Sequence, residues 1–225
     1  MKRNQRVISM FFVVIFSIFS NTAAFSEPAN LSLLVQEIKA YHDSGAYQKE
    51  LTEAIMPARN YIADRAKANA QSSHPEKLAV VLDIDETSLS NYNRLLSHRF
   101  MPSKKQMQKD IAAADAPPIE DMLSLYDDAL KQGVTVFFVT GRTESDRLAT
   151  DTNLKQAGYH DWAGLYFKPQ DYNQSSVVPF KSSARSTIRN LGYTIVASIG
   201  DQESDLKGGY AEKVFKLPNP YYYIP

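Results

Sequence analysis

The chain has 225 residues, carries 25 basic and 25 acidic side chains, and contains no cysteine. A formal net charge of zero argues against a protein that binds nucleic-acid polymers or anionic membranes through a basic surface. Without cysteine, the chain can form neither disulfide bonds nor thiolate metal sites.

The first 26 residues predict a cleavable secretory signal peptide. Basic residues precede an apolar stretch at 7–19, and small and polar residues follow it. This pattern predicts cleavage after Ser26 or after Ala24, and a secreted or periplasmic protein. The apolar stretch is shorter than the ~20 residues of a membrane-spanning helix, so we expect no stable membrane association after cleavage. Cleavage would leave 22 basic and 25 acidic side chains in a single domain of residues 27–225.

Two segments predict a small helical cap. Residues 31–70 have the apolar periodicity of helices, which we expect at 31–42 and 46–70. Pro57 should kink the second helix or divide it into two. The segment 88–118 is polar and lacks long apolar runs, as is typical of an inserted cap or lid.

The rest of the chain alternates apolar strands with amphipathic helices. This alternation predicts an α/β fold with a mostly parallel sheet, right-handed crossovers and helices on both faces. The expected strands are 78–82, 134–139, 164–167, 193–199 and 213–216, and the expected helices are 119–132, 144–157 and 179–190.

The first expected strand ends in two acidic residues, Asp83 and Asp85. Residues two apart in an extended segment point to the same side, so both carboxylates should face one small volume. Two carboxylates that close repel each other unless a cation or a proton lies between them. This stretch therefore predicts a metal site or an acid–base pair at the carboxyl end of the strand.

Reactive side chains also follow two later strands. Thr140 follows the second strand, Asp201 and Asp205 follow the fourth, and Lys181 opens the helix before the fourth. In a parallel sheet these strand ends share one edge, where residues distant in sequence converge. Carboxylate oxygens suit Mg²⁺, and a hydroxyl beside an ammonium forms a cradle for phosphate.

Four motifs at these positions resemble, in their order, those of the haloacid dehalogenase superfamily. They are Asp83-Ile84-Asp85-Glu86-Thr87, Thr140-Gly141-Arg142, Lys181, and Gly200-Asp201-Gln202-Glu203-Ser204-Asp205. The strings at 80–91 and 215–220 resemble more closely its secreted acid phosphatase branch, subfamily IIIB. That branch includes class B-like bacterial acid phosphatases and plant vegetative storage proteins. The resemblance implies the Rossmann-like fold of the superfamily with a small cap.

The resemblance also implies a Mg²⁺-dependent acid phosphatase that hydrolyses small phosphate monoesters through an aspartyl-phosphate, with nucleotides among the candidate substrates. Asp83 would be the nucleophile. Asp85, partly protonated at acid pH, would be the general acid and then the general base. Thr140 and Lys181 would complete the catalytic set by holding phosphoryl oxygens. The other implied contacts are to Mg²⁺ through Asp83, the backbone carbonyl of Asp85, Asp201 and Asp205, and to substrate through Thr87, Gly141 and Arg142.

Several of these residues also fit structural roles. Asp205 fits the cap of a turn, Lys181 fits a solvated lysine at a helix start, and Arg142 fits either a phosphate contact or a salt bridge that pins its loop. The run at 221–223 fits packing at the edge of the core. Aromatic rings that could stack on a nucleobase or aryl group, or could simply pack in the cap, are Tyr92, Phe100, Trp162, Phe167 and Tyr172.

The sequence alone allows two other functions. A storage or binding protein would keep the fold and lose catalysis, and a phosphotransferase would pass the phosphoryl group to an alcohol. Retention of Asp83, Asp85, Thr140, Lys181 and Asp201 favours catalysis over storage. The sequence leaves open whether the chain forms a homo-oligomer.

Overall fold

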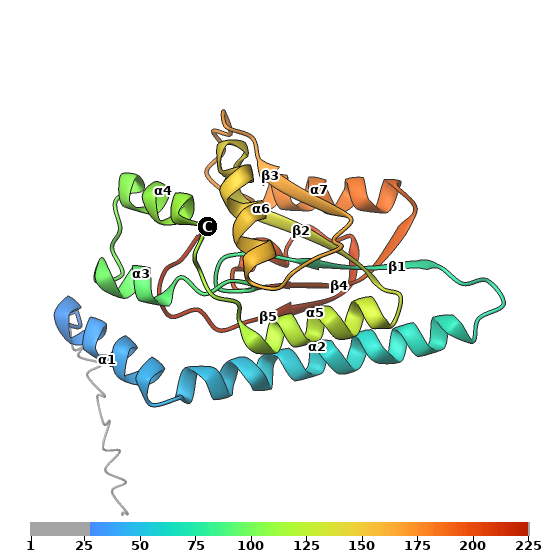
Figure 1. The fold of residues 1–225 in the computed structure, drawn as a ribbon, viewed down its shortest axis with the longest axis horizontal. Helices are drawn as coiled ribbons and strands as arrows, with labels where there is room; N and C mark the ends of the chain where they lie inside the picture. Colours follow the sequence, from blue (N-terminus) through green and yellow to red (C-terminus); the bar gives the residue numbers. More distant parts are fainter. Residues whose placement is uncertain (1–27, 225) are drawn as a thin grey trace, which may run out of the picture.

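The computed structural model describes residues 28–224, and the predicted signal peptide lies outside this range (Figure 1). The described residues form a five-stranded sheet in the order β3-β2-β1-β4-β5, with every pairing parallel. The strands are β1 Lys77–Leu82, β2 Thr135–Thr143, β3 Gly164–Lys168, β4 Tyr193–Gly200 and β5 Ala211–Lys216. The helices are α1 Leu31–Asp43, α2 Ala46–Ala70, α3 Tyr92–Ser97, α4 Lys104–Ala113, α5 Glu120–Lys131, α6 Arg147–Gln156 and α7 Val178–Asn190. The predicted α/β fold is confirmed.

β1 lies at the centre of the sheet because its side chains are apolar on both faces. Leu78, Val80 and Leu82 belong to one buried cluster, and Ala79 and Val81 belong to another. Alternate side chains of a strand point to opposite faces, so a continuously apolar strand is stable between two covering layers. β1 pairs with β2 on one side and with β4 on the other, which brings the ends of these three strands together.

Helices cover both faces of the sheet. α2 and α5 pack over one face, and α7 packs over the other (Figure 1). On α2, Ile55, Ala58 and Ile62 are buried in the larger cluster. On α7, Ala184 and Ile188 belong to the cluster of the second face. α2 therefore forms a layer of the core.

α2 continues without interruption through Pro57. The expectation that this proline divides the segment into two helices is wrong. Proline removes one backbone hydrogen bond of the helix, but the buried residues Ile55 and Ala58 on either side hold it against the sheet. Tertiary packing outweighs the local preference here.

Shorter helices gather at the carboxyl edge of the sheet, where β1 ends. α3 and α4 lie within the polar segment 88–118, and Figure 1 shows them at the same end of the molecule as α1. α1 has no buried residue, although Val35 and Ile38 pack against the core. Among residues 28–224, no helix combines the length and the apolar character needed to cross a membrane.

Candidate active site

Three buried carboxylates meet at the carboxyl edge of the sheet. Asp83 directly follows β1, Asp201 directly follows β4, and Asp205 ends a short 3-10 turn at Glu203–Asp205. One carboxylate oxygen of each residue lies within 4.8 Å of the others. None of the three residues is more than 6% exposed. The strand ends therefore bring together acids that lie far apart in the sequence.

Lys181 places a positive charge inside this acidic cluster. Its Nζ donates to Asp83 Oδ1 at 2.7 Å and also to Asp205 Oδ1. Burial alone lowers the pKa of this lysine, but the Asp205 and Asp83 carboxylates outweigh burial and raise it. Lys181 is only 4% exposed, so it is a fixed internal cation and not a solvated lysine at a helix start.

Lys181 does not neutralise the cluster completely. One ammonium faces three carboxylates, so two negative charges remain. Burial, together with the charges of Asp205 and Asp201, raises the pKa of Asp83 well above its usual value. A divalent cation would restore the balance, and Mg²⁺ prefers carboxylate oxygens as ligands. The donor set of the cluster fits the metal that the sequence predicts.

Asp85 forms an ion pair with Arg142. Arg142 Nη2 donates to Asp85 Oδ1 at 2.7 Å, and Nε donates to Oδ2 at 3.1 Å, which fixes the plane of the carboxylate. Asn91 Nδ2 donates to Asp85 Oδ1 at 2.8 Å. Arg142 Nη1 donates to Thr150 Oγ1 on α6 at 3.0 Å, so α6 also helps to hold the guanidinium in place. The sequence allows two roles for Arg142, and the structure shows the salt bridge.

This ion pair changes the expected protonation of Asp85. Burial alone raises the pKa of Asp85, but the Arg142 guanidinium and the Asn91 amide outweigh burial and hold it below its usual value. Asp85 in the free protein therefore keeps its negative charge to lower pH than an ordinary aspartate. The ion pair with Arg142 thus disfavours the proton on Asp85 in the free protein, and the acid–base role of Asp85 stays a prediction.

Three more of the predicted site residues lie at this edge of the sheet: Thr140, Gly141 and Thr87. Thr140 Oγ1 is buried and accepts from the Arg142 backbone N–H at 3.1 Å. Apart from its chain neighbours, Gly141 has no atom within 4 Å of the position that a Cβ would take, which leaves room for a small molecule. Thr87 Oγ1 donates to Asp201 Oδ1 at 3.2 Å and accepts from the Asp201 N–H at 3.1 Å. Thr87 thus supports Asp201.

The turn after β4 is held by residues that the sequence does not single out. Arg185 lies one helical turn after Lys181 and donates to the carbonyl oxygens of Asp205 at 2.8 Å and Gly209 at 2.9 Å. Ser198 Oγ donates to the Asp205 carbonyl at 3.0 Å. A buried arginine whose partners are backbone carbonyls has no motif of its own. Its spacing from Lys181 is the one signal in the sequence that could have indicated it.

Three of the aromatic residues considered for stacking are packed inside the protein. Tyr92 and Phe100 are buried, and their ring centroids lie 5.6 and 5.5 Å from that of Tyr221. Phe167 is buried, with the Arg147 guanidinium 4.5 Å above its ring. These three aromatic residues therefore pack inside the protein, as the second alternative predicts.

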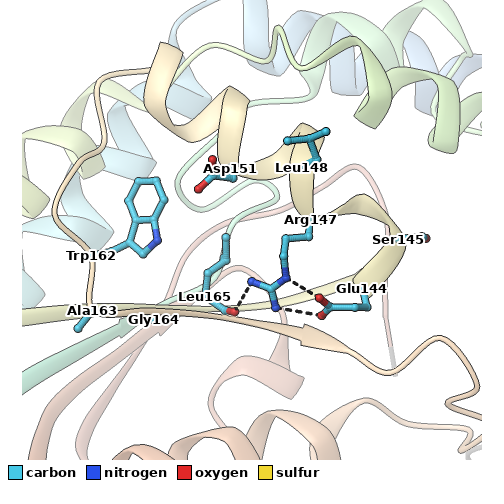
Figure 2. A pocket seen from close by; sticks show the side chains of 9 residues that line it. All are labelled: Glu144, Ser145, Arg147, Leu148, Asp151, Trp162, Ala163, Gly164 and Leu165. Carbon is cyan, nitrogen blue, oxygen red and sulfur yellow. Dashed lines mark hydrogen bonds and ion pairs between the residues drawn. The ribbon is translucent and has the colours of Figure 1, made fainter.

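A surface groove of about 530 Å³ lies beside α6 and β3 (Figure 2). Its lining includes Trp162, the exposed Leu148 and the ion pair between Arg147 and Glu144. None of its lining residues belongs to the predicted catalytic, substrate-binding or metal-binding sets. The candidate active site is therefore defined by the converging strand ends and not by this groove.

A family model described as haloacid dehalogenase (HAD) superfamily, subfamily IIIB (acid phosphatase), matches residues 20–225. The chain belongs to this family. The predicted family and the predicted enzyme class, acid phosphatase, are both confirmed.

Relatives of this chain include a plant phosphatase and a plant storage protein. Acid phosphatase 1 of Solanum lycopersicum is 38% identical over 148 residues, 64% of this chain and 58% of that protein. Vegetative storage protein 2 of Arabidopsis thaliana is 27% identical over 235 residues, 93% of this chain and 88% of that protein. The solved class C acid phosphatase from Bacillus anthracis matches with a TM-score of 0.64 at 19% identity, covering 85% of this chain and 86% of that chain. This structural likeness shows a shared fold.

Proposed function

We propose that this chain is a Mg²⁺-dependent acid phosphatase that hydrolyses small phosphate monoesters, nucleotides included, through an aspartyl-phosphate on Asp83. The observation that carries the proposal is the arrangement of Asp83, Asp201 and Asp205 around Lys181 in one buried cluster. Phosphoryl transfer needs mainly positioning and charge neutralisation, and this cluster supplies both. The predicted export signal and a mature domain of residues 27–225 remain part of the proposal.

The cation would be held by carboxylate oxygens of Asp83 and Asp201 and by the backbone carbonyl of Asp85. Asp205 would bind it directly or through a water molecule. When bound, Mg²⁺ supplies positive charge beside the phosphoryl group and lowers the pKa of Asp83. The nucleophile then stays ionised although it is buried among other acids.

The reaction would proceed in two steps on the protein's own side chains. In the first, a carboxylate oxygen of Asp83 attacks phosphorus, the bond from phosphorus to the ester oxygen breaks, and Asp85 gives its proton to the leaving oxygen. In the second, water attacks the aspartyl-phosphate and Asp85 takes a proton from that water. Inorganic phosphate leaves, and Asp83 is regenerated. Lys181 and Thr140 would hold the phosphoryl oxygens throughout.

The proton for the first step would reach Asp85 when substrate binds. Arg142 stabilises the anionic form of Asp85 in the free protein. A bound phosphoryl group adds negative charge next to Asp85, which raises its pKa, and competes for the Arg142 guanidinium. Both effects favour the protonated carboxyl. Because this uptake draws protons from solvent, acidic pH assists it, as is appropriate for an acid phosphatase.

A second candidate function is storage without catalysis, because one relative is a vegetative storage protein. The observed charge pairing supports catalysis instead. Lys181 is buried between two buried carboxylates, and the buried Arg142 pairs with the partly buried Asp85, an arrangement that is costly to maintain without a ligand.

The test compares the wild type with Asp83→Asn and Asp64→Asn, all freed of metal with EDTA and then assayed with and without Mg²⁺. Asp64 is exposed on α2 and serves as the matched control. We expect the wild type and Asp64→Asn to hydrolyse p-nitrophenyl phosphate and 5′-nucleotides only with Mg²⁺. We expect Asp83→Asn to lose at least about 10³-fold in kcat, because the amide cannot attack phosphorus.

Full activity of Asp83→Asn would contradict the covalent mechanism. A wild type that is indifferent to EDTA would contradict the metal assignment. A correctly folded wild type that hydrolyses none of these esters in the presence of Mg²⁺ would support storage.

A further inference from the structure

The last part of the chain crosses the edge of the sheet next to the carboxylate cluster. After β5, the Leu217 backbone N–H donates to the Gly200 carbonyl at 2.9 Å, and both Leu217 and Tyr221 are buried. The Tyr221 ring stacks on Phe100, with 5.5 Å between centroids and 10° between planes. The segment 219–224, here named the C-terminal clamp, is therefore anchored by Leu217 just before it and by Tyr221 near its middle.

The C-terminal clamp contacts Asp201 directly. Asn219 Nδ2 donates to Asp201 Oδ2 at 2.6 Å, and Gln202 Nε2 donates to the same oxygen at 2.6 Å. Thr87 Oγ1 donates to the other oxygen, Oδ1, at 3.2 Å. Donors on both oxygens fix the orientation of a carboxylate, and such supporting hydrogen bonds tune the affinity of a metal ligand.

The clamp also holds Gln202, the second donor to Asp201. The Ile224 backbone N–H donates to Gln202 Oε1 at 3.0 Å. Gln202 Nε2 donates to the Tyr222 carbonyl at 3.4 Å. Both ends of the Gln202 amide are thus engaged by the clamp, so two donors to Asp201 depend on residues 219–224.

A further contact reaches the turn after β1. Tyr222 Oη donates to Glu86 Oε2 at 2.5 Å, and the Asn91 backbone N–H donates to Glu86 Oε1 at 2.7 Å. Glu86 has φ 52°, in the left-handed region that residues other than glycine rarely adopt. Such a conformation persists only where the surroundings hold it. Glu86 directly follows Asp85, so its conformation sets the direction of the Asp85 carbonyl.

We propose that the C-terminal clamp positions the cation ligands of both loops, with Asn219 acting on Asp201 and Tyr222 acting on the turn that carries the Asp85 carbonyl. The inference rests on the proposed function, because it presupposes a cation at this cluster. One segment contacts both loops, so it holds them at a fixed separation. Asn219 and Tyr222 act through other residues, which makes them positioning residues.

The test measures Mg²⁺ binding by titration calorimetry on metal-free protein. Asn219→Ala removes the donor to Asp201, and Tyr222→Phe removes only the hydroxyl that reaches Glu86. Tyr223→Phe is the matched control, because Tyr223 is 74% exposed. We expect the Mg²⁺ dissociation constant to rise about 10- to 100-fold in Asn219→Ala, to rise by a smaller factor in Tyr222→Phe, and to stay within about twofold in Tyr223→Phe.

Two further readouts separate positioning from a merely structural role. Metal-free Tyr222→Phe should still unfold in one cooperative transition, with its midpoint lowered by no more than about 2–4 °C, because one hydrogen bond to Glu86 is lost. Saturating Mg²⁺ should restore kcat in both variants, because the ligands themselves are intact. Unchanged Mg²⁺ affinity in Tyr222→Phe, with a wild type that binds Mg²⁺, would overturn the clamp alone, even where Asn219→Ala fails to fold. A wild type that binds no Mg²⁺ would overturn the proposed function, and the clamp with it.

Discussion

Lys181 and Arg142 pair with different acidic residues of the site. Lys181 forms ion pairs with both Asp83 and Asp205, whereas the carboxylate that pairs with Arg142 is Asp85. Asp83 shares the Lys181 ammonium with Asp205, so its negative charge is only partly balanced. Burial and the nearby Asp205 charge therefore raise the pKa of Asp83. Asp85 has a guanidinium to itself, and its pKa is lowered in spite of burial. Asp83 and Asp85, only two positions apart, therefore have pKa values shifted in opposite directions.

Glycine at the end of β4 lets Asp205 pack against the backbone. A Cβ at Gly200 would lie 2.3 Å from the Asp205 Cβ, which is too close for two carbon atoms that are not bonded to each other. We expect Gly200→Ala to lower the free energy of unfolding by about 1–3 kcal/mol and to displace Asp205 from Lys181. Urea unfolding measures the loss. Gly141→Ala is the control for stability, because no atom beyond its chain neighbours lies within 4 Å of its Cβ position. Equal stability of the two variants would contradict the packing argument.

At the scale of elements, α2 is tied to the edge strand β5 by an ion pair. Arg65 Nε and Nη2 donate to the two carboxylate oxygens of Glu212 at 2.7 and 2.8 Å, and Tyr61 Oη donates at 2.9 Å. Hydrogen bonding from Arg65 lowers the pKa of Glu212. A lowered carboxyl pKa stabilises the folded state above the usual value of about 4.3, and this contribution is lost as pH falls through the lowered value.

We therefore expect Glu212→Gln to cost about 0.5–1 kcal/mol of unfolding free energy at pH 7. The difference from the wild type should shrink as the pH falls below the usual glutamate value of about 4.3 and vanish once Glu212 is itself protonated. Urea unfolding across this range measures it. Glu53→Gln is the control, since Glu53 is 63% exposed and 3.6 Å from Lys49. A cost that is independent of pH would show that the ion pair is not its source.

Across the whole molecule, α2 packs the part of the chain that precedes β1 against the sheet. It packs against α5, β4 and β5, and its buried stripe belongs to the larger core cluster. The candidate site at the carboxyl edge therefore depends on a helix that precedes all of its motifs in the sequence.

Ile55→Ala tests this role of α2. Ile55 is 2% exposed, so removing most of its side chain should cost about 2–5 kcal/mol in a single cooperative unfolding transition. Its neighbour Met56 is 47% exposed, and Met56→Ala should change stability by no more than about 0.5 kcal/mol. Urea unfolding followed by circular dichroism compares the two. A loss below about 1 kcal/mol for Ile55→Ala, or two separate transitions, would show that α2 is not integral to the core.

Much of the fold and the centre of the candidate site could be predicted from local sequence. Each strand is a short apolar run and each motif is a short string at its end, so periodicity and strand-end chemistry place Asp83, Asp201, Asp205 and Lys181 at one edge. Local rules failed at Pro57, where buried neighbours keep a helix intact that the proline alone would break. Arg185 was missed because its partners are backbone carbonyls, which carry no residue signature.

The parallel α/β fold, the family and the acids at the strand ends could be predicted from the sequence, because they follow from patterns a few residues long. The pairing of the charges could not, because it depends on the tertiary structure. Arg142 lies 57 positions from Asp85, Lys181 lies 98 from Asp83, and Tyr222 lies 136 from Glu86. Contacts over such separations depend on the sheet order and on side-chain directions that no local pattern specifies. The same topology brings residues 219–224 back to Asp201 after β4 and to Glu86 in the turn after β1.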